Sequence, residues 1–514
     1  MNNQNKYSTY QKVSLLLGIP IFLAILLLLH PTGLSPEGQK TLAIAVLMAF
    51  WWITEALPIP ATALIPLALF PALGIMSYRD VAPNYSDSVI FLFMGGFLLA
   101  MAMQKWQLHK RLALRIVSVI GTSSHRIVLG FMTASAFISM MISNTSTTLL
   151  MYPIGLAVIL QLAELKKANT NEEKLDDGTH FQTALLLGIA YASSVGGIAT
   201  LIGTPPNVIF AGVVTSIFPQ APAVGFFQWM LIGVPLSVLF IPVIWICLTR
   251  LIFPLSRVEV AGGKQVIRQQ LAQLGKITRG ERLTLIIFIV TAFALIFRRD
   301  IDLHIITIPG WSDWLGLSAL VSDTTVVMFA ALLMFAIPVD LKKGEFVLDW
   351  QWAVKIPWGL LLLFGGGIAL AKGFQTTGLA AWLGSHLTYL QNVPVILMIL
   401  SICLLLTFLT ELTSNTAITT IFMPILASTA VAMHTHPFLL MIPAAMSASC
   451  AFMLPVATPP NAIIFGSGYI RISQMTRAGF ALNILGAVLI TLLVYLLALP
   501  VFNISPGTVP VWAQ

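Results

Sequence analysis

A polar phrase occurs twice within strongly hydrophobic sequence, and this duplication constrains the fold more than any other feature of the chain. Ser-Asn-Thr occupies residues 143–145 and again residues 414–416, and a proline follows each threonine by eight positions. Two further phrases are doubled: Gly-Gly at 95–96 and 365–366, and Thr-Pro-Pro-Asn at 204–207 and 458–461. The chain therefore contains two related halves, each with two helix-breaking polar sites. This pattern is typical of membrane transporters built from repeats around a binding site at the bilayer midplane.

The composition places the chain in the membrane. Hydrophobic residues make up 58% and charged residues 9% of the 514, whereas an ordinary soluble domain is about 25% charged. The three cysteines lie in apolar stretches without metal-ligand spacing, which favours packing roles over disulfides. The first apolar run, residues 13–29, lacks an Ala-x-Ala-like cleavage site and is interpreted as a retained span. We therefore expect an all-α polytopic membrane protein.

Eleven apolar segments have about the 20 residues that a membrane-spanning helix needs. They lie near residues 13–30, 40–55, 58–76, 87–103, 181–217, 226–252, 282–298, 323–338, 352–373, 438–466 and 479–503. Two further stretches, 126–161 and 393–433, carry the Ser-Asn-Thr phrases at their centres. We expect these to be re-entrant helical hairpins, since single crossings would give the two halves inconsistent topologies. Irregular backbone at membrane depth is tolerated where it is buried in protein or lines a cavity.

The basic residues predict the orientation. With a cytoplasmic N-terminus, all of the 27 Lys and Arg residues except Lys40, Arg298, Arg299 and Lys372 fall in cytoplasmic segments, including Lys6, Lys174 and the basic loop at 253–281. Eleven spans then place the C-terminus outside the plasma (inner) membrane. An odd number of spans between equivalent elements inverts the second half relative to the first. The concentration of basic residues in cytoplasmic segments also explains the net charge of +8, so no nucleic-acid partner is expected.

The doubled phrases suit the binding of both an anion and a cation. A helix N-terminus carries a partial positive charge and free N–H groups, whereas unwound carbonyls suit a small hard cation. Asn supplies an acceptor and two donors, and Ser and Thr hydroxyls serve in either role. Intramembrane charges are nearly absent, with Glu55, Lys372 and Glu411 as the chief exceptions. Bound cations would therefore neutralise an anionic substrate, and this would couple their movements.

Each feature also has a simpler interpretation. Ser and Thr in membrane helices often make only local or interhelical hydrogen bonds, and Pro-Pro can produce a simple kink. Glu411, three residues before Ser414, either orients the second hairpin or faces a cavity; Met140 occupies its place in the first. A membrane-embedded hydrolase would need a nucleophile–base or metal constellation, and neither His-Glu-x-x-His nor Gly-x-Ser-x-Gly occurs. A channel stays open as a further class, although paired hairpins favour alternating access.

The chain resembles the divalent anion/sodium symporter family. The resemblance rests on Thr-Glu-Ala-Leu-Pro-Ile-Pro at 54–60, the paired Ser-Asn-Thr hairpins, and Phe-Met-Leu-Pro-Val-Ala-Thr-Pro-Pro-Asn at 452–461, and it extends over roughly residues 40–503. It implies eleven spans plus two hairpins in inverted repeats, divided into scaffold and transport domains. It also implies a homodimer in the lipid bilayer that works by an elevator movement. The segments 104–124 and 374–390 would be arms that link the two domains.

The resemblance also implies the site residues. A first Na⁺ site would use Ser139, Ser143, Asn144 and Gly203, and a second would use Thr410, Thr413, Asn415 and Ala457. Substrate carboxylates would contact Ser143, Asn144, Thr145, Ser414, Asn415, Thr416, Thr458 and Pro459. The repeat supports this assignment, because Ser139 aligns with Thr410 and Gly203 with Ala457. Both triplets end in Thr, which resembles the C4-dicarboxylate pattern of the family.

These inferences combine into one hypothesis. The chain is expected to be a symporter, not an enzyme, that takes up C4-dicarboxylates such as succinate, fumarate and malate with two or more Na⁺ ions. The alternatives are a Na⁺-independent di-/tricarboxylate exchanger and a sulfate symporter of the same family. The expected units are scaffold helices with an arm (1–125), a first transport half (126–252), the cytoplasmic loop (253–281), second scaffold helices with an arm (282–390) and a second transport half (391–514).

Overall fold

The computed structural model describes residues 8–121, 123–168, 176–255, 263–302, 307–386 and 393–513. Lys6, Lys174 and parts of the segments 253–281 and 374–390, which carry predictions made above, lie outside the described residues. Within the described ranges the chain is almost entirely helical. Strands occur there only as two short antiparallel pairs: β1 (Ile301–Asp302) with β2 (Thr307–Ile308), and β3 (Pro338–Asp340) with β4 (Glu345–Phe346).

The helices follow the expected order in both halves. The first half contains α1 (Thr9–Leu27), α2 (Pro36–Thr54), α3 (Ile59–Thr62), α4 (Ile65–Ala72), α5 (Tyr78–Val81), the 3₁₀-helix η1 (Ala82–Ser86), α6 (Ser88–Lys105), α7 (Leu108–Ile120), α8 (Ser124–Ser139), α9 (Asn144–Ala168), α10 (Asp176–Ile198), α11 (Pro205–Ile217), α12 (Phe226–Ile246) and the π-helix η2 (Cys247–Ile252). The second half contains α13 (Gly263–Gln273), α14 (Arg279–Ile296), α15 (Trp311–Trp314), α16 (Asp323–Ala336), α17 (Trp350–Ala353), α18 (Trp358–Thr376), α19 (Leu379–Ser385), α20 (Val395–Thr410), α21 (Asn415–Ala432), α22 (Phe438–Ala448), α23 (Pro459–Phe465), α24 (Ile472–Leu493), the π-helix η4 (Val494–Ala498), α25 (Leu499–Val501) and the 3₁₀-helix η5 (Val511–Ala513).

Helices lie in all eleven segments expected to span the membrane. Among the described residues, seven helices are long and apolar enough to cross a bilayer by themselves. A protein with several such helices is a multi-pass membrane protein. The number of crossings and the re-entrant course of the two hairpins stay predictions.

Two of the expected spans differ in detail, and prolines explain both differences. The segment 58–76 is divided into α3 and α4, with Pro66 in the first turn of α4. The segment 352–373 begins in the short helix α17, and its long helix α18 starts only at Trp358, directly after Pro357. Proline lacks a backbone donor and its ring clashes with the preceding turn, so a helix ends before it or begins with it.

The order of elements is itself duplicated. The run from α6 to α12 is matched by the run from α18 to α24, and α12 and α24 each continue into a π-helix. Both α6 and α18 are followed by a residue in the left-handed conformation, Gln107 (φ 54°) and Gly378 (φ 74°). The helices α7 and α19 start directly after these residues, within the segments expected to be arms. The duplication seen in the sequence therefore extends to backbone conformation.

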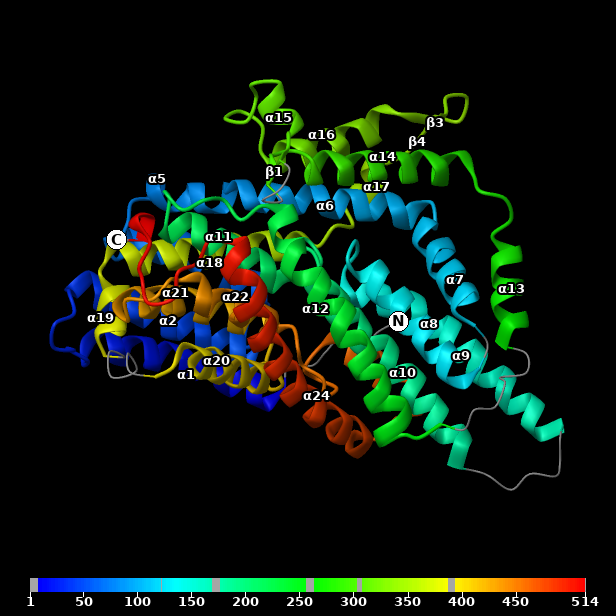
Figure 1. The fold of residues 1–514 in the computed structure, drawn as a ribbon. Helices are drawn as coiled ribbons and strands as arrows, with labels where there is room; N and C mark the ends of the chain where they lie inside the picture. The colour runs from blue at the N-terminus through cyan, green and yellow to red at the C-terminus, as the bar shows by residue number, and fades with distance from the viewer. Residues whose placement is uncertain are drawn as a thin grey trace.

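The two halves are interleaved in space. Figure 1 shows α14, α15 and α16 along one edge beside α6, with α1, α2 and α19–α21 toward one end and α7–α10 with α13 toward the other. The broken helices cross between the halves: α11 packs against α18 and α21, and α23 packs against α9 and α10. This packing brings the polar phrases of both halves together in the interior.

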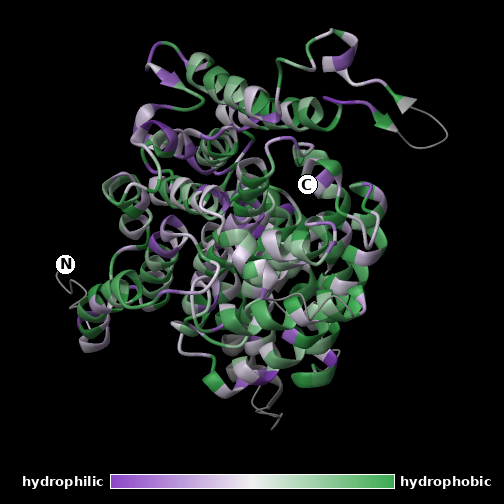
Figure 2. Cartoon of the chain, turned by 90° about the vertical axis from the view of Figure 1, so that its left-hand side faces the viewer, coloured by the Kyte–Doolittle hydropathy of each residue, from purple (hydrophilic) through white to green (hydrophobic). Residues whose placement is uncertain are grey.

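The outer faces of the peripheral helices are apolar. Figure 2 shows hydrophobic residues along most of the helices, with hydrophilic residues concentrated in turns and connections. On α14, Val290 and Phe293 are 60% and 59% exposed, and Phe329 on α16 is 63% exposed. Large exposed apolar side chains on neighbouring helices suit contact with lipid or with another apolar surface.

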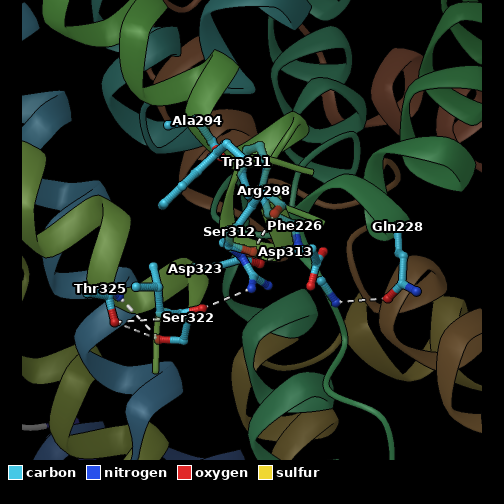
Figure 3. Close-up of polar contacts among 12 residues, drawn as sticks. Phe226, Gln228, Ala294, Arg298, Trp311, Ser312, Asp313, Ser322, Asp323 and Thr325 are labelled. Carbon is cyan, nitrogen blue, oxygen red and sulfur yellow. Dashed lines mark hydrogen bonds and ion pairs between the residues drawn. The ribbon is translucent and has the colours of Figure 1, made fainter. Parts of the chain in front are cut away.

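A buried ion pair joins three helices at one edge of the molecule, as Figure 3 shows. The Asp323 carboxylate, at the start of α16, accepts hydrogen bonds from the Arg298 side chain at 2.5 Å and from the Phe226 backbone N–H at 2.8 Å. Arg298 also donates to the carbonyl of Val321 at 3.0 Å. Since Phe226 is the first residue of α12, the cluster links α12 to the end of α14 and the start of α16.

A second set of charged contacts fixes the start of α7. Lys105 pairs with Asp349 at 2.8 Å, and Trp106 Nε1 donates to the carbonyl of Val347 at 2.7 Å. Arg111 in α7 forms a buried two-point pair with Glu281 at 2.8 and 3.1 Å, and it also donates to carbonyls of the loop before α14. These contacts hold the first arm helix against α14 and the β4–α17 segment.

Candidate binding site

The first hairpin turns sharply at its Ser-Asn-Thr phrase. The helix α8 ends at Ser139 and α9 begins at Asn144, so the polar residues occupy the turn and the N-terminus of the second helix. The Ser139 hydroxyl donates to the Asn144 side-chain oxygen at 2.7 Å, and the Thr148 hydroxyl donates to the Asn144 carbonyl at 2.9 Å. Ser143 accepts a hydrogen bond from the backbone N–H of Ser146 at 3.3 Å. The turn is therefore held by its own side chains.

The second hairpin repeats this geometry with matching residues. Its first helix, α20, ends at Thr410, and α21 begins at Asn415 after Ser414. The Thr410 hydroxyl donates to the Asn415 side-chain oxygen at 2.5 Å, and the Thr419 hydroxyl donates to the Asn415 carbonyl at 2.7 Å. Each of these contacts has its counterpart in the first hairpin. Ser139 and Thr410, which the repeat aligns, therefore make equivalent contacts in the structure.

The Thr-Pro-Pro-Asn phrases end two unwound segments, as expected. In the first, α10 ends at Ile198 and α11 begins at Pro205; in the second, α22 ends at Ala448 and α23 begins at Pro459. The closing asparagine of each phrase folds the segment back on itself. Asn207 Nδ2 donates to the Thr200 carbonyl at 2.8 Å.

The second closing asparagine makes the equivalent bond. Asn461 Nδ2 donates to the carbonyls of Leu454 and Ala451, both at 3.0 Å. Leu454 precedes Asn461 by the same seven positions that separate Thr200 from Asn207. Both asparagines are fully buried. Their donors therefore satisfy carbonyls that the broken helices would otherwise leave unpaired.

Oxygen atoms converge where the first hairpin meets the first unwound segment. A Cβ atom built on Gly197 would lie 2.4 Å from the Asn144 side-chain oxygen and 3.1 Å from the Gly203 carbonyl oxygen, and one on Gly203 would lie 2.4 Å from the Gly197 carbonyl oxygen. With Ser139 bonded to Asn144, the structure brings together three of the four predicted ligands of the first Na⁺ site. Glycine is needed at 197 and 203 because any side chain would fill the space between these oxygens.

The second site is assembled less tightly. Thr410 bonds to Asn415 and to the carbonyl of Ala448 at 3.1 Å, so the hairpin contacts the end of α22. Ala457 is buried, and the Thr413 hydroxyl is buried without a partner in the described part of the chain. An orphaned buried hydroxyl beside these oxygens fits a cation ligand, since buried polar groups are otherwise paired.

The predicted substrate residues are divided between exposed and buried positions. Ser143, Asn144, Thr145, Ser414 and Asn415 are partly exposed, whereas Thr416 and Thr458 are buried and Pro459 is exposed. The Thr458 hydroxyl accepts from the backbone N–H of Asn461 at 3.3 Å and so caps α23. The two unwound segments meet at the hydroxyls of Thr204 and Ser449, 3.5 Å apart.

Four helices begin at or next to these residues, and the partial positive charges of helix N-termini favour an anion. The four helices are α9, α11, α21 and α23. Within the described ranges, the four ion pairs all involve residues outside the two hairpin turns and the two unwound segments, and no cluster of His, Cys, Asp and Glu could hold a metal ion.

Glu411 holds the second hairpin against its unwound segment. Its carboxylate accepts hydrogen bonds from the backbone N–H groups of Phe452, Met453 and Leu454 at 2.6, 2.8 and 3.0 Å, and from Asn483 Nδ2 at 2.7 Å. The side chain is buried, with 3% exposed. Of the two roles left open by the sequence, the contacts support the orienting one.

The first half holds its unwound segment differently. The Thr200 hydroxyl donates to the Met140 carbonyl at 2.7 Å, and Met140 occupies the position of Glu411 in the repeat. Tyr191 then links the halves by donating to the carbonyl of Phe452 at 2.7 Å. Gly197, Thr200 and Tyr191 were not predicted, since their contacts arise only when distant segments pack.

Comparisons of the sequence with known proteins agree on one family, and a solved structure shares the fold. The model of the sodium:sulfate symporter transmembrane region matches residues 9–503. The sodium-dependent dicarboxylate transporter SdcS of Staphylococcus saprophyticus is 45% identical over 504 residues, 98% of this chain and 94% of that protein. SdcS of Staphylococcus aureus (strain bovine RF122) is 43% identical over 490 residues, 95% and 91% of the two chains. The crystal structure of the Alcanivorax borkumensis YdaH transporter is similar in fold, with a TM-score of 0.52 and 14% identity over 96% of this chain and 98% of that one.

Proposed function

We propose, from the premise that this chain belongs to the sodium:sulfate symporter transmembrane region family, that it couples inward Na⁺ movement to the uptake of C4-dicarboxylates such as succinate, fumarate and malate. Membership makes the protein a membrane transporter and not an enzyme. The observation that carries the proposal is the convergence of the Asn144 side-chain oxygen, the Gly203 carbonyl and the Ser139 hydroxyl at one hairpin tip. The names of the SdcS relatives support both the ion and the substrate class.

Neutral oxygens beside helix N-termini explain how the coupling works. Two or more Na⁺ ions would bind first, through Ser139, Ser143, Asn144 and Gly203 in one half and Thr410, Thr413, Asn415 and Ala457 in the other. Each Asn side-chain oxygen points to the hydroxyl at the end of the preceding helix, which leaves its amide donors for a carboxylate. The dicarboxylate would then meet Ser143, Asn144, Thr145, Ser414, Asn415, Thr416, Thr458 and Pro459. Without the cations, no fixed positive side chain would offset its charge.

The movement that we propose is an elevator-type exchange within a homodimer. The hairpins and broken helices would form the transport domain, and α1–α6 with α14–α18 would form the scaffold. The left-handed residues Gln107 and Gly378 support this division, because each separates a long helix from a short arm helix. The proposed orientation places the N-terminus in the cytoplasm and the C-terminus outside.

Two alternatives within the family remain candidates for the test. A Na⁺-independent exchanger would not need the oxygen cluster at Gly197 and Gly203, so the close approach of these residues favours the symporter. The description of the family names sulfate, and a tetrahedral dianion would also suit four helix N-termini. The identity of the SdcS relatives favours a dicarboxylate.

The decisive experiment is the uptake of radiolabelled succinate into proteoliposomes, with Na⁺ or K⁺ outside and the lumen either empty or loaded with dicarboxylate. We expect uptake into empty vesicles that requires Na⁺ and is not competed by sulfate. Uptake that ignores Na⁺ but requires internal dicarboxylate would identify an exchanger. Uptake competed by sulfate in preference to succinate would identify a sulfate symporter.

Matched variants connect this activity to the hairpin tips. Asn144→Ala and Asn415→Ala should each weaken both Na⁺ activation and succinate affinity, because each amide is proposed to face both ligands. Asn84→Ala is the control, since the Asn84 side chain in η1 donates to the carbonyls of Asp80 and Val81 at the end of α5, away from the hairpin tips. Normal Na⁺ dependence in either tip variant would contradict the shared role of the asparagines.

A further inference from the structure

The C-terminal end of α11 extends beyond the length of its counterpart in the second half. α11 (Pro205–Ile217) has 13 residues, whereas α23 (Pro459–Phe465) has 7. By the offset of 254 residues between the Thr-Pro-Pro-Asn phrases, Val214 is equivalent to Gly468, which has a left-handed backbone with φ 77°. Glycine in this conformation commonly ends a helix, whereas valine strongly disfavours it. The sequence itself therefore gives α11 a C-terminal extension, residues 212–217, that α23 lacks.

The C-terminal extension packs against α18 through both apolar and polar contacts. A Cβ atom built on Gly212 would lie 2.8 Å from the Cδ1 atom of Ile368. The Ser216 hydroxyl donates to the carbonyl of Ile368 at 3.3 Å, and Gln375 Nε2 donates to the carbonyl of Ile217 at 2.6 Å. The last carbonyls of a helix have no partner within the helix, so Gln375 satisfies one that α11 cannot. The end of α11 is therefore held by α18.

The second half makes no equivalent contact. Other contacts of α11 and α23 correspond, because α11 packs against α21 and α22, and α23 packs against their equivalents α9 and α10. The counterpart of the α11–α18 contact would join α23 to α6, and no comparable packing occurs there in the described part of the chain. A Cβ atom built on Gly466, the equivalent of Gly212, would meet only carbonyl oxygens of its own helix, at 3.2 and 3.5 Å. The contact with a long helix is therefore specific to the first half.

We infer that the C-terminal extension of α11 and the facing side of α18 form a one-sided latch for the elevator movement. The inference rests on the proposed function, in which α11 belongs to the transport domain and α18 to the scaffold. Movement of one domain past the other must then break the contacts of Gly212, Ser216 and Ile217 with α18. Because α23 has no such extension, the opposite end state gains no equivalent contact. The latch therefore favours the state in which α11 lies against α18.

The strength of the latch suits a contact that opens in every cycle. A contact that exists in only one of two conformations shifts the populations toward that conformation. Two neutral hydrogen bonds and one apolar contact bias the resting protein, but the net stability of each such hydrogen bond is modest, so the contact is also readily broken. The release of α11 from α18 is therefore a step of each transport cycle.

The test is a reversible cross-link between α11 and α18 in proteoliposomes. In the double variant Gly212→Cys/Ile368→Cys the two β-carbons lie close enough for a disulfide, which copper phenanthroline forms and mass spectrometry detects. We expect Na⁺-dependent succinate uptake to fall to background on oxidation and to return with dithiothreitol. Ser216→Cys/Ile368→Cys is a second pair, in case Gly212→Cys is poorly folded. Gly466→Cys/Ile368→Cys is the matched control, which should form no disulfide and keep its uptake, since α23 does not pack against α18 in the described structure.

The outcomes separate the latch from the proposed function. If wild-type uptake ignores Na⁺, the symport proposal fails, whereas the loss of that uptake on cross-linking would still support the latch. If the disulfide forms and uptake continues at the wild-type rate, α11 and α18 stay together throughout transport, and the latch is overturned. It is also overturned if neither pair forms a disulfide.

A further variant tests the two hydrogen bonds of the latch. Ser216→Ala and Gln375→Ala, added to Gly212→Cys/Ile368→Cys, remove both bonds and leave the cysteine pair in place. We expect disulfide formation to be slower by about twofold or more, because the latched state becomes less populated. An unchanged rate would show that these bonds do not stabilise the latched state.

Discussion

The two halves of this protein build the same backbone with different chemistry. In both, a hairpin tip centred on an asparagine faces an unwound segment closed by a second asparagine. In the first half the unwound segment is held to the hairpin by a neutral hydroxyl–carbonyl bond. In the second half one buried carboxylate, Glu411, accepts three backbone N–H bonds. The shared geometry is therefore not tied to one set of residues.

The halves also differ in how closely their oxygens approach. Gly197 and Gly203 leave no room for a Cβ atom, because the Asn144 side-chain oxygen and each other's backbone lie so close, whereas Ala451 and Ala457 stand at the equivalent positions of the second half. The methyl group of alanine keeps apart segments of backbone that can come close together where the residue is glycine. The first unwound segment therefore relies on close backbone approach, whereas the second is held by hydrogen bonds from three backbone N–H groups to a buried carboxylate.

The largest effect is expected from Glu411→Gln. With its oxygen in the place of Oε1, the amide still accepts from Phe452, Met453 and Asn483, but its nitrogen faces the Leu454 N–H, which also donates. Hydrogen bonds to a charged group contribute about 1.5–3 kcal/mol each and neutral ones about 0.5–1.5 kcal/mol. The loss of the Leu454 bond and the weakening of the other three should together reduce succinate uptake about 100-fold or more. Uptake rates and thermal unfolding of the purified variant measure this.

Met140→Leu is the control for Glu411, because the first half uses the Met140 carbonyl and not its side chain. It should transport within about twofold of the wild type, since volume-conserving apolar exchanges are well tolerated. Equal losses in both variants would mean that position in the hairpin, and not the carboxylate, matters.

The second prediction tests close approach in the first half. In Gly197→Ala the added methyl would lie 2.4 Å from the Asn144 side-chain oxygen, so the hairpin tip must move. We expect the Na⁺ concentration for half-maximal uptake to rise about tenfold or more, because small displacements of ligands are costly in a preorganised site. Ala451→Gly, the reciprocal change, should leave Na⁺ activation nearly unchanged. A mild effect of Gly197→Ala would show that the tip is not confined by α10.

Much of this candidate site could be predicted from the sequence, because the repeat identifies which positions of the two halves are equivalent. The repeat does not show which residues contact one another. The duplicated phrases predicted the turns between α8 and α9 and between α20 and α21, and both helix breaks, because asparagine, serine and proline act on local backbone; the re-entrant course of the hairpins stays a prediction. The partners of Glu411 could not be predicted, since Phe452 and Asn483 come from segments 41 and 72 residues away. The contact of Gly197 with Asn144 depends on the packing of α10 against the hairpin, which no local pattern encodes.

A smaller effect is expected from Thr200→Val, which removes the hydroxyl bond to the Met140 carbonyl. A neutral hydrogen bond contributes about 0.5–1.5 kcal/mol, so succinate uptake should fall by about two- to tenfold. This is the first-half equivalent of Glu411→Gln, and the ratio of the two losses measures how unequally the halves are held. A loss as large as that of Glu411→Gln would remove the distinction between the neutral and the charged attachment.

The smallest effect is expected on stability, from His436 in the connection between the hairpin and the broken helix of the second half. His436 lies between α21 and α22, where its Nδ1 accepts from the Phe438 backbone N–H at 3.2 Å and its ring packs against Trp512. Burial lowers the pKa of His436 from 6.5 to about 4. The unfolded chain therefore binds a proton near pH 6.5 that the native protein takes up only near pH 4, so stability is lost as the pH falls through this window.

The His436→Gln variant isolates this contribution, since glutamine can accept the same bond without titrating. The thermal unfolding midpoints of the two proteins should run parallel above pH 7. Between pH 6.5 and pH 4 the wild type should lose a few degrees more than the variant. Succinate uptake at pH 7.5 should be the same in both, because the site at the hairpin tips does not involve this loop. Parallel unfolding curves over the whole range would mean that the His436 ring is accessible to protons in the native state.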